Sequence, residues 1–378
     1  MIKYKLGDVV KVISERVDNP ANSEYDKFVG LEHYVSSEIE IKKYGDTSLL
    51  KSAMKVFKSG DILIARRNVY LKRASIVKFD GITSGDSIVL RVEDKLLQRI
   101  IPFILNTDEF WAYAEKFSDG TMSKRLSPKV LLEYEFMLPQ IEQLEKLADL
   151  LWAANDTKEA YKKLLLLTDE LVKSQFIEMF GDPVENPMGW VETALGDVAE
   201  IKIGPFGTLL HKEDYIENGH AVVNPSHIID GKICIDPKLT ISDRKYNELA
   251  SYQLKIGDVV LGRRGEMGRC AVVYEEGLLC GTGSMIIRAG HQMKPFFLHH
   301  ILSSPKYKKI IEDKAVGVTM MNLNVPIVSS LRIPLLPINL QEQFISLMEQ
   351  ANKSKLELKQ NINSLETTIK VLMSRNFG

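Results

Sequence analysis

The sequence predicts an α+β protein: two related mixed α/β domains separated by two long antiparallel coiled-coil helices, in a pseudo-twofold arrangement. Two observations predict this fold class. The chain repeats itself once at a nearly constant offset, and each repeat ends in a long stretch rich in Leu, Glu, Lys, Ala and Gln. The length of 378 residues is sufficient for two or three ordinary domains.

Short motifs occur once in each half of the chain, in the same order. The segment SGDILIARR at 59–67 corresponds to IGDVVLGRR at 256–264, so that the two arginine pairs lie 197 positions apart. The dipeptides Leu138–Pro139 and Leu336–Pro337 lie 198 positions apart. Several motifs at nearly one offset indicate an internal duplication.

Within each repeat, short alternating or apolar runs are followed by one long helical stretch. Runs such as 61–67 (DILIARR) and 87–92 (SIVLRV) are typical of strands. A proline closes each mixed segment, and two prolines mark a linker between the halves. We therefore expect a first mixed domain over 1–138, a long helix over 139–181, a linker over 182–189, a second mixed domain over 190–337 and a second long helix over 338–378.

Apolar residues in both long helices recur at a spacing of three and four positions, which favours a coiled-coil seam over two separate surface helices. Because only a short linker follows the first helix, the second helix can pair with it only by running back antiparallel. Polar residues at Lys158, Thr168, Asn361 and Thr368 predict a loose pairing. The expected seam residues are Leu144, Leu147, Leu151, Leu165, Val172, Phe344, Leu347, Leu358, Leu365 and Leu372.

Composition excludes several classes of protein. Cys234, Cys270 and Cys280 include no CxxC pair, so neither a zinc ribbon nor a disulfide framework is expected. No run approaches the ~18 apolar residues of a membrane span, and the N-terminal apolar stretch is too short for a signal peptide. We expect a cytoplasmic protein. Since the net charge is −1, any affinity for nucleic acid must come from locally arranged cations.

The motifs and their duplication resemble the specificity (S) subunit of type I restriction–modification systems. The resemblance covers essentially the whole chain and is carried by the order of its motifs. These motifs are LGDV near the start of each half (6–9 and 195–198), GPFGT at 204–208, GDVVLGRRGEMG at 257–268 and PLLPINLQEQ at 334–343.

The resemblance implies a non-catalytic subunit in which each mixed domain is a target-recognition domain for one half of a bipartite, asymmetric site on double-stranded DNA. The helices would set the spacer and dock methyltransferase (M) subunits, expected to be two, and restriction (R) subunits would join them. This chain would bind no cofactor: S-adenosylmethionine would belong to the M subunits, and ATP and Mg to the R subunits. The sequence has neither a GxxxxGK[ST] loop nor an Asp/Asn-Pro-Pro-Tyr/Phe motif.

Candidate DNA-binding residues are the cations and amides near strand ends and loops, because Arg, Asn and Gln discriminate bases and Lys contacts phosphates. Arg66 and Arg263 are in phase with apolar strand residues, so framework and phosphate-contact roles both stay open for one arginine of each pair. The unlike residues after each pair are better candidates for specificity. The candidates are Arg66, Arg67, Asn68, Tyr70, Lys72, Arg73, Lys124, Arg125, Thr208, Lys212, Asn224, His227, Arg263, Arg264, Arg269 and Asn322.

Three further expectations concern the loops and the alternatives to DNA recognition. The GPFGT loop is expected to approach a phosphate through backbone donors, with Phe206 in the core. His299 and His300 are expected on a helix face, and no metal site is expected. A metal-dependent nuclease acting through Glu93 and Lys95, and a structural adaptor that does not bind DNA, remain alternative functions.

Overall fold

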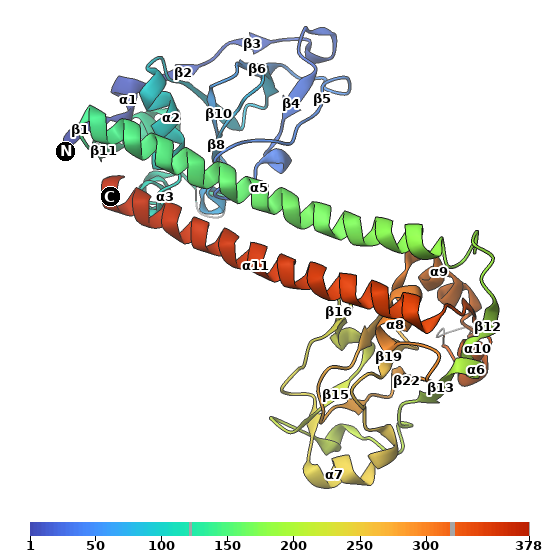
Figure 1. Cartoon of the computed structure of the whole chain (residues 1–378). Helices are drawn as coiled ribbons and strands as arrows, with labels where there is room; N and C mark the ends of the chain where they lie inside the picture. Colours follow the sequence, from blue (N-terminus) through green and yellow to red (C-terminus); the bar gives the residue numbers. More distant parts are fainter. Residues whose placement is uncertain (121–122, 318–321, 378) are drawn as a thin grey trace. The chain divides into compact units, whose positions relative to one another are not determined.

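The computed structural model describes residues 1–120, 123–317 and 322–377 (Figure 1). The chain divides into two compact units: unit 1 comprises residues 1–165 and 356–378, and unit 2 comprises residues 166–355. We call the mixed parts of these units head 1 (1–138) and head 2 (190–337). Among the described residues, no helix combines the length and the apolar character that crossing a bilayer requires.

Head 1 consists of short strands and short helices. Its strands are β1 (Ile2–Lys5), β2 (Lys11–Ile13), β3 (Arg16–Val17), β4 (Lys27–Val29), β5 (Gly45–Asp46), β6 (Met54–Phe57), β7 (Ile62–Ala65), β8 (Ala74–Ile76), β9 (Gly81–Thr83), β10 (Ser87–Arg91) and β11 (Glu135–Leu138). Its helices are α1 (Leu6–Val9), α2 (Lys95–Ile104), α3 (Asp108–Phe117) and α4 (Pro128–Leu132), with 3₁₀ turns η1 (Pro20–Asn22), η2 (Leu31–His33) and η3 (Val69–Leu71).

Head 2 has a similar order of elements. Its strands are β12 (Glu192–Ala194), β13 (Ala199–Ile203), β14 (Tyr215–Ile216), β15 (His220–Val223), β16 (Ile228–Ile229), β17 (Lys232–Ile233), β18 (Thr240–Ile241), β19 (Val259–Gly262), β20 (Cys270–Val272), β21 (Leu279–Cys280), β22 (Ser284–Ala289) and β23 (Arg332–Pro334). Its helices are α6 (Leu195–Val198), α7 (Asp243–Glu248), α8 (Pro295–Ser303), α9 (Pro305–Lys314) and α10 (Val325–Ser329), with 3₁₀ turns η4 (Lys212–Asp214), η5 (Pro225–His227) and η6 (Ala250–Tyr252).

The strand topology confirms the internal duplication. The order β2-β10-β7-β8 in head 1 corresponds to β13-β22-β19-β20 in head 2, and the pair β1-β11 corresponds to β12-β23. The register agrees as well, since Leu63 faces Val89 in one sheet and Val260 faces Ile286 in the other. The repeated motifs therefore encode one sheet that is built twice.

A buried ion pair organises the repeated Gly-Asp motif in each sheet. Gly60 has a φ of +92°, a conformation that glycine adopts readily, and Asp61 follows it at the start of β7. The Asp61 carboxylate is 2% exposed and accepts hydrogen bonds from Arg91 Nε at 2.8 Å and Arg91 Nη2 at 2.7 Å. In head 2, Asp258 and Arg288 form the same bidentate pair at 2.7 and 2.8 Å.

The second sheet of each head is where the two halves differ. Head 1 has the order β3-β6-β9-β4-β5, whereas head 2 has β14-β18-β15-β21 and a separate hairpin of β16 and β17. Both sheets keep one parallel pair, β4 with β9 and β15 with β21. The heads thus share a scaffold and differ in the strands added to it.

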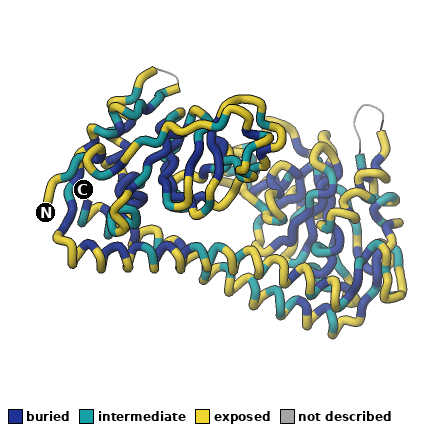
Figure 2. Tube along the Cα trace, turned by 90° about the horizontal axis from the view of Figure 1, so that it is seen from above, coloured by how far each residue is buried: buried dark blue, intermediate teal, exposed yellow. Residues whose placement is uncertain are grey.

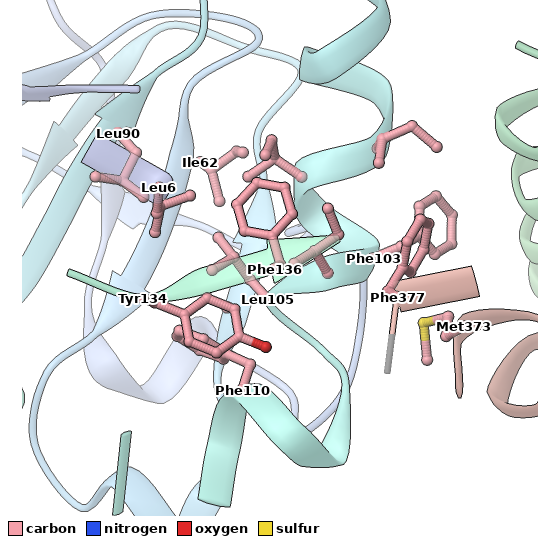
Figure 3. Packing of buried hydrophobic residues seen from close by; sticks show 14 of the residues in the cluster. Leu6, Ile62, Leu90, Phe103, Leu105, Phe110, Tyr134, Phe136, Met373 and Phe377 are labelled. Atoms are coloured by element: carbon pink, nitrogen blue, oxygen red, sulfur yellow. The ribbon is translucent and has the colours of Figure 1, made fainter. Parts of the chain in front are cut away.

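The core of head 1 extends from its sheet to the last turns of the C-terminal helix (Figure 3). Leu6, Ile62 and Phe103 are completely buried in this cluster. Figure 3 shows Met373 and Phe377 from the end of the chain beside Phe103. Burial of these apolar side chains ties the C-terminus to the first domain.

The two long helices are α5 (Ile141–Phe180) and α11 (Ile338–Phe377), each of 40 residues. Gly181, with a φ of +72°, follows α5, and its N–H donates to Ile177 O at 2.8 Å, a common helix C-terminus. Unit 1 contains the first part of α5 and the last part of α11, whereas unit 2 contains the other two parts. The helices therefore run antiparallel, as predicted, and buried and exposed residues alternate along them (Figure 2).

Apolar side chains of α5 and α11 pack together in both units. In unit 1, buried residues of α5 and the end of α11 share one cluster; they are Leu144, Leu147, Leu151, Ile369, Met373 and Phe377, with Leu365 and Leu372 half-buried against them. In unit 2, Val172, Phe176 and Phe180 pack with Phe344, while Leu347 is half-buried against them. Leu165 and Leu358 are half-buried.

The seam of α11 differs from the predicted one in its second half. Asn361 and Thr368 are exposed, whereas their neighbours Ile362 and Ile369 are buried. An α-helix has 3.6 residues per turn, so a strict seven-residue repeat drifts around its surface and the buried stripe moves by one residue. The expectation that Asn361 and Thr368 loosen the seam was wrong.

Among the predicted polar residues, Lys158 is buried, with 4% of its surface exposed, and Thr168 is half-buried. The Lys158 ammonium group lies 3.5 Å from Glu38 and 3.6 Å from Glu159. Lys162 pairs with Glu38, and Lys42 pairs with Glu159. Pairing of this kind is required for a buried cation, and here it attaches the loop before β5 to α5.

We expect Asp61→Asn to destabilise unit 1 by about 2 kcal/mol, because the substitution removes the buried charged acceptor of two Arg91 hydrogen bonds. The free energy of unfolding, measured by urea denaturation of the full chain, checks this value. Asp149→Asn is the matched control: Asp149 pairs with Arg99 but its side chain is 71% exposed, so we expect less than about 1 kcal/mol. Equal effects of the two substitutions would contradict the role of Asp61.

The stability of unit 2 should fall as the pH is lowered from 7 to 5. Burial, with a smaller contribution from His299, lowers the pKa of His300 from 6.5 to about 4. The His300 ring packs 4.3 Å from that of Phe176 and 5.3 Å from that of Phe344. Below pH 6.5 the unfolded chain binds a proton that the folded chain does not, so acid favours unfolding.

His300→Leu should reduce this loss of unfolding free energy between pH 7 and 5, measured by urea denaturation at both values. His291→Leu, at an exposed position of the same unit, is the control and should leave the pH dependence as in the wild type. If the His300 variant lost as much stability as the wild type, the buried ring would not be the cause.

Candidate nucleic-acid interface

The candidate site of each head lies where three segments meet at the end of a central strand. In head 1, the N–H of Arg66 donates to Asp86 O at 2.9 Å, and Leu126 N–H donates to Arg66 O at 2.9 Å. In head 2, Arg263 N–H donates to Gly283 O at 2.9 Å, and Leu323 N–H donates to Arg263 O at 3.1 Å. These backbone hydrogen bonds show that the segments before Pro128 and Pro326 occupy corresponding places in the two heads.

The first arginine of each pair is more enclosed than the second. Arg66 is half-buried and its Nε donates to Leu126 O at 3.3 Å, whereas Arg263 is only 5% exposed. Burial, followed by the charge of Arg125, lowers the pKa of Arg66. Burial and the charge of Arg264 have the same effect on the pKa of Arg263. This burial favours the framework interpretation over a phosphate contact for Arg263 in particular.

The second arginine of each pair is exposed. In head 1, Arg67 Nε lies 3.1 Å from Asp86 Oδ1, and Arg125 pairs with the same carboxylate oxygen. Asn68, in the left-handed conformation, accepts a hydrogen bond from Ser123 Oγ at 3.0 Å. In head 2, Arg264 Nε donates to Asn322 Oδ1 at 3.2 Å. The structure therefore brings Arg67 and Arg125 together, and likewise Arg264 and Asn322.

The residues after the arginine pair of head 1 largely serve the fold. Lys72 pairs with Asp108 at 2.6 Å, and Arg73 donates to the backbone oxygens of Leu31 and Arg67 at 3.1 and 3.0 Å. Tyr70 is 59% exposed. The expectation that the unlike residues after each pair carry specificity is therefore weakened for Lys72 and Arg73 by the partners that these side chains already have.

Two other cations are similarly engaged within their own head. Arg269 Nη1 lies 2.5 Å from Glu266 and donates to Ile228 O at 3.3 Å. Lys124 Nζ donates to Glu115 O at 2.9 Å and also lies 3.8 Å from the Glu115 carboxylate. Both side chains would have to exchange an internal partner for a phosphate in order to contact DNA.

Two cations near the candidate site of head 1 were missed by the sequence analysis. Arg16 and Lys55 face each other across β3 and β6. Lys55 Nζ donates to Ser87 O at 2.7 Å, and burial, followed by the charges of Arg66 and Arg16, lowers the pKa of Lys55. Arg16 and Lys55 lie 39 positions apart in the sequence, and Lys55 is on β6 whereas Arg66 follows β7. Only the sheet pairing therefore reveals the cluster.

The glycine-rich loop of head 2 is built differently from the prediction. Gly204 lies so close to the backbone of Gly281 that a Cβ atom would be 2.0 Å from Gly281 O. Phe206 is 60% exposed, so the expectation that it packs in the core was wrong. Thr208 and Lys212 are also exposed, which leaves this loop accessible to a ligand. The tight approach at Gly204 turns the following residues outward from the sheet.

Asn224 and His227 mainly shape the turn η5. His227 is 8% exposed, and its Nδ1 lies 2.9 Å from Val222 O and 3.2 Å from Asn224 N. Asn224 Oδ1 lies 3.5 Å from the N–H of Gly283, a long contact. A role in capping the turn therefore fits His227 better than a contact with a base.

The residues of the nuclease alternative have structural partners. Glu93 pairs with Lys11 at 2.5 Å, and Asp94 caps α2 by accepting hydrogen bonds from the N–H groups of Leu96 and Leu97. His299 and His300 lie on α8, as expected. Within residues 1–120, 123–317 and 322–377, no three or more His, Cys, Asp or Glu side chains are grouped so as to hold a metal ion.

We expect Phe206→Ala to change the free energy of unfolding of unit 2 by less than about 0.5 kcal/mol, because the ring is exposed. Phe297→Ala is the control within the same unit: Phe297 is completely buried, and its truncation should cost about 3–5 kcal/mol. Urea denaturation of both variants checks the difference. A large loss from Phe206→Ala would show that the ring supports the core after all.

Comparison with known proteins finds similarity to proteins of type I restriction–modification systems. Residues 187–367 match the family model for the type I restriction modification DNA specificity domain. The putative type I restriction enzyme MjaX specificity subunit of Methanocaldococcus jannaschii is 27% identical over 202 residues, which cover 51% of this chain and 46% of that protein. The type I restriction enzyme MjaIX specificity subunit of the same organism is 24% identical over 229 residues, which cover 56% and 51%. The chain spans about half the length of these curated relatives.

Two solved structures share the fold of nearly the whole chain. One belongs to work on complex assembly and conformational transition of the type I R-M system, with a TM-score of 0.60, 19% identity and coverage of 99% of this chain and 96% of that chain. The other is the type I restriction–modification S subunit from M. genitalium, with a TM-score of 0.60, 16% identity and coverage of 98% and 95%. The predicted fold class is confirmed.

Proposed function

We propose that this chain, a member of the type I restriction–modification specificity-subunit family, is the component of its system that recognises DNA. One observation supports this proposal most strongly. The two heads share a sheet and a backbone arrangement at the end of its central strand, yet they present different exposed side chains there. A duplicated scaffold with unlike surface groups fits the recognition of two different half-sites.

The charge of the chain limits how it binds DNA. A net charge of −1 provides no general attraction to the phosphate backbone, so contacts must come from local groups such as the cations around Arg66. Non-specific affinity should therefore be low and should fall further with salt. A protein that recognises sequence through a few local groups gains most of its discrimination from base contacts.

The partners that we propose follow from the family. Two M subunits would dock on α5 and α11 and methylate adenine with S-adenosylmethionine, and R subunits would add ATP- and Mg-dependent cleavage. This chain would contribute recognition without a catalytic group or a cofactor of its own, in the cytoplasm. The uninterrupted 40-residue helices that join the two heads would set the number of base pairs between the half-sites.

Methylome sequencing of the host with and without the gene tests the proposed function. We expect a bipartite, asymmetric motif with an undefined central spacer that is methylated only when the gene is present. The purified complex of the full chain and its methyltransferase partner should protect the same motif at a stated salt concentration. The proposal would be overturned if the complex bound all duplexes equally, or if the methylated motif did not depend on the gene.

Insertion of seven residues into each long helix tests the role of α5 and α11. Placing one heptad between residues 165 and 166 and another between residues 355 and 356 preserves the antiparallel register while adding about 10 Å to each helix. We expect a longer central spacer with both half-sites unchanged in the methylome. A heptad in α5 alone is the control and should impair the protein, because it breaks the pairing. An unchanged spacer would refute the proposed role.

A further inference from the structure

We propose that Arg67 and Arg264 each contact a guanine in their half-site, and that Asp86 and Asn322 are the residues that position them. The inference rests on the proposed function and goes beyond it by assigning one base contact and one positioning residue to each head. It follows from how each arginine is held and from which edge of its guanidinium group is left for a ligand.

The two arginines occupy the same place in the two heads. Arg67 forms an isolated antiparallel bridge with Arg125, and Arg264 forms one with Asn322. The partner strands correspond too, since Arg125 bridges to Asp119 and Asn322 bridges to Val316. The two backbone hydrogen bonds between Arg125 and Asp119 measure 2.8 and 3.1 Å, and those between Asn322 and Val316 measure 2.9 and 3.1 Å. Any difference in function at this position must therefore come from the side chains.

In head 1, a carboxylate holds the arginine through its inner nitrogen. Arg67 Nε lies 3.1 Å from Asp86 Oδ1, and the side chains of Arg67 and Asp86 are 50% and 24% exposed. Asp86 lies in the turn between β9 and β10, and its backbone oxygen also accepts a hydrogen bond from the Arg66 N–H. Because the sheet fixes the carboxylate, the guanidinium group is oriented before a ligand binds.

In head 2, the side-chain amide of Asn322, rather than a carboxylate, holds the second arginine. Gly283 occupies the position that corresponds to Asp86, because its oxygen accepts the Arg263 N–H as Asp86 O accepts the Arg66 N–H. A glycine offers no acceptor side chain, and Arg264 Nε donates instead to Asn322 Oδ1 at 3.2 Å. The same nitrogen of the second arginine is therefore held in both heads, by residues from different segments.

The way the arginines are held determines which edge they present. With Nε engaged, the outer edge of the planar guanidinium group, which carries one N–H of each Nη group, is left for a ligand. In the described residues, the contacts of the Arg67 and Arg264 side chains run through Nε. Paired Nη donors match the O6 and N7 acceptors of guanine in the major groove, the commonest specific contact of arginine with a base.

The other candidate cations are less suitable for this contact. Arg263 is buried, and the single ammonium group of Lys72 is paired with Asp108. Arg269 already uses its terminal Nη1 for Glu266 and Ile228 O, whereas Arg67 and Arg264 are held through Nε. Arg125 shares the Asp86 carboxylate with Arg67, so it adds a second positive charge beside the same position. The excess positive charge at this edge attracts the acceptor-rich edge of guanine and disfavours the amino group of cytosine or adenine.

The test uses the complex of the full chain with its methyltransferase partner and a duplex library randomised in both half-sites. We expect Arg67→Ala to lower discrimination at one guanine of one half-site by about 5- to 150-fold and to leave the other half-site unchanged. Arg264→Ala should do the same in the other half-site. Arg67→Lys should retain only part of the discrimination, because a lysine ammonium group has no planar fork that Asp86 can orient through Nε.

The positioning role has its own readout. Asp86→Ala should lower discrimination at the same base pair as Arg67→Ala. Asp86→Asn should retain most of that discrimination, because an amide oxygen can accept a hydrogen bond from Nε, as Asn322 does in head 2. Asp108→Ala is the matched control: its carboxylate pairs with Lys72 in the same head and should leave the motif unchanged. Co-purification with the partner and an unchanged melting temperature show that each variant is folded.

Three results would overturn the inference while leaving the proposed function intact. The first is a uniform loss of binding to all sequences with a smaller salt dependence, which indicates a phosphate contact. The second is a loss of base discrimination at a position of the motif that is not a guanine. The third is that Arg67→Ala and Arg264→Ala leave the recognised motif unchanged. If the wild-type complex itself showed no bipartite preference, the proposed function would fail instead.

Discussion

The buried ion pairs Asp61–Arg91 and Asp258–Arg288 hold together the part of each head on which the candidate site depends. The aspartate follows a glycine with positive φ at the start of a central strand, and the arginine ends the neighbouring strand. Each carboxylate is almost completely buried, so its charge requires this bidentate partner. The pair fixes β7 on β10 and β19 on β22, and the exposed arginines stand at the other end of these same strands.

This arrangement separates stability from recognition along a single strand. The apolar residues of β7 and β19 pack into the core, the first arginine of each pair is enclosed, and the second arginine reaches the surface. Divergence between the heads is confined to the side chains around that arginine and to the second sheet, where strand order differs. A rigid sheet that presents variable groups is a suitable scaffold for changing a half-site without loss of the fold.

The long helices belong to both units, because each unit buries one part of α5 against one part of α11. Removal of either helix would expose an apolar stripe in both units. The interface is not uniform: aromatic residues dominate in unit 2, whereas Lys158 and its carboxylate partners adjoin the apolar seam in unit 1. Because the partners of Lys158 are Glu38 and Glu159, this cation fixes the loop before β5 on α5.

The sequence alone predicted the duplication, the antiparallel helices and the resemblance to type I specificity subunits, because motif order, periodicity and the short linker are properties of the chain itself. The pairing of Arg67 with Asp86 and Arg125, and of Arg264 with Asn322, was decided by tertiary structure, since these contacts join segments 19 to 58 positions apart. Lys55 and Arg16 were missed for the same reason. The burial predicted for Phe206 was wrong because it depends on how the loop leaves its sheet, which the local pattern does not determine. The positions predicted for Asn361 and Thr368 were wrong because the buried face of a long helix drifts around its axis.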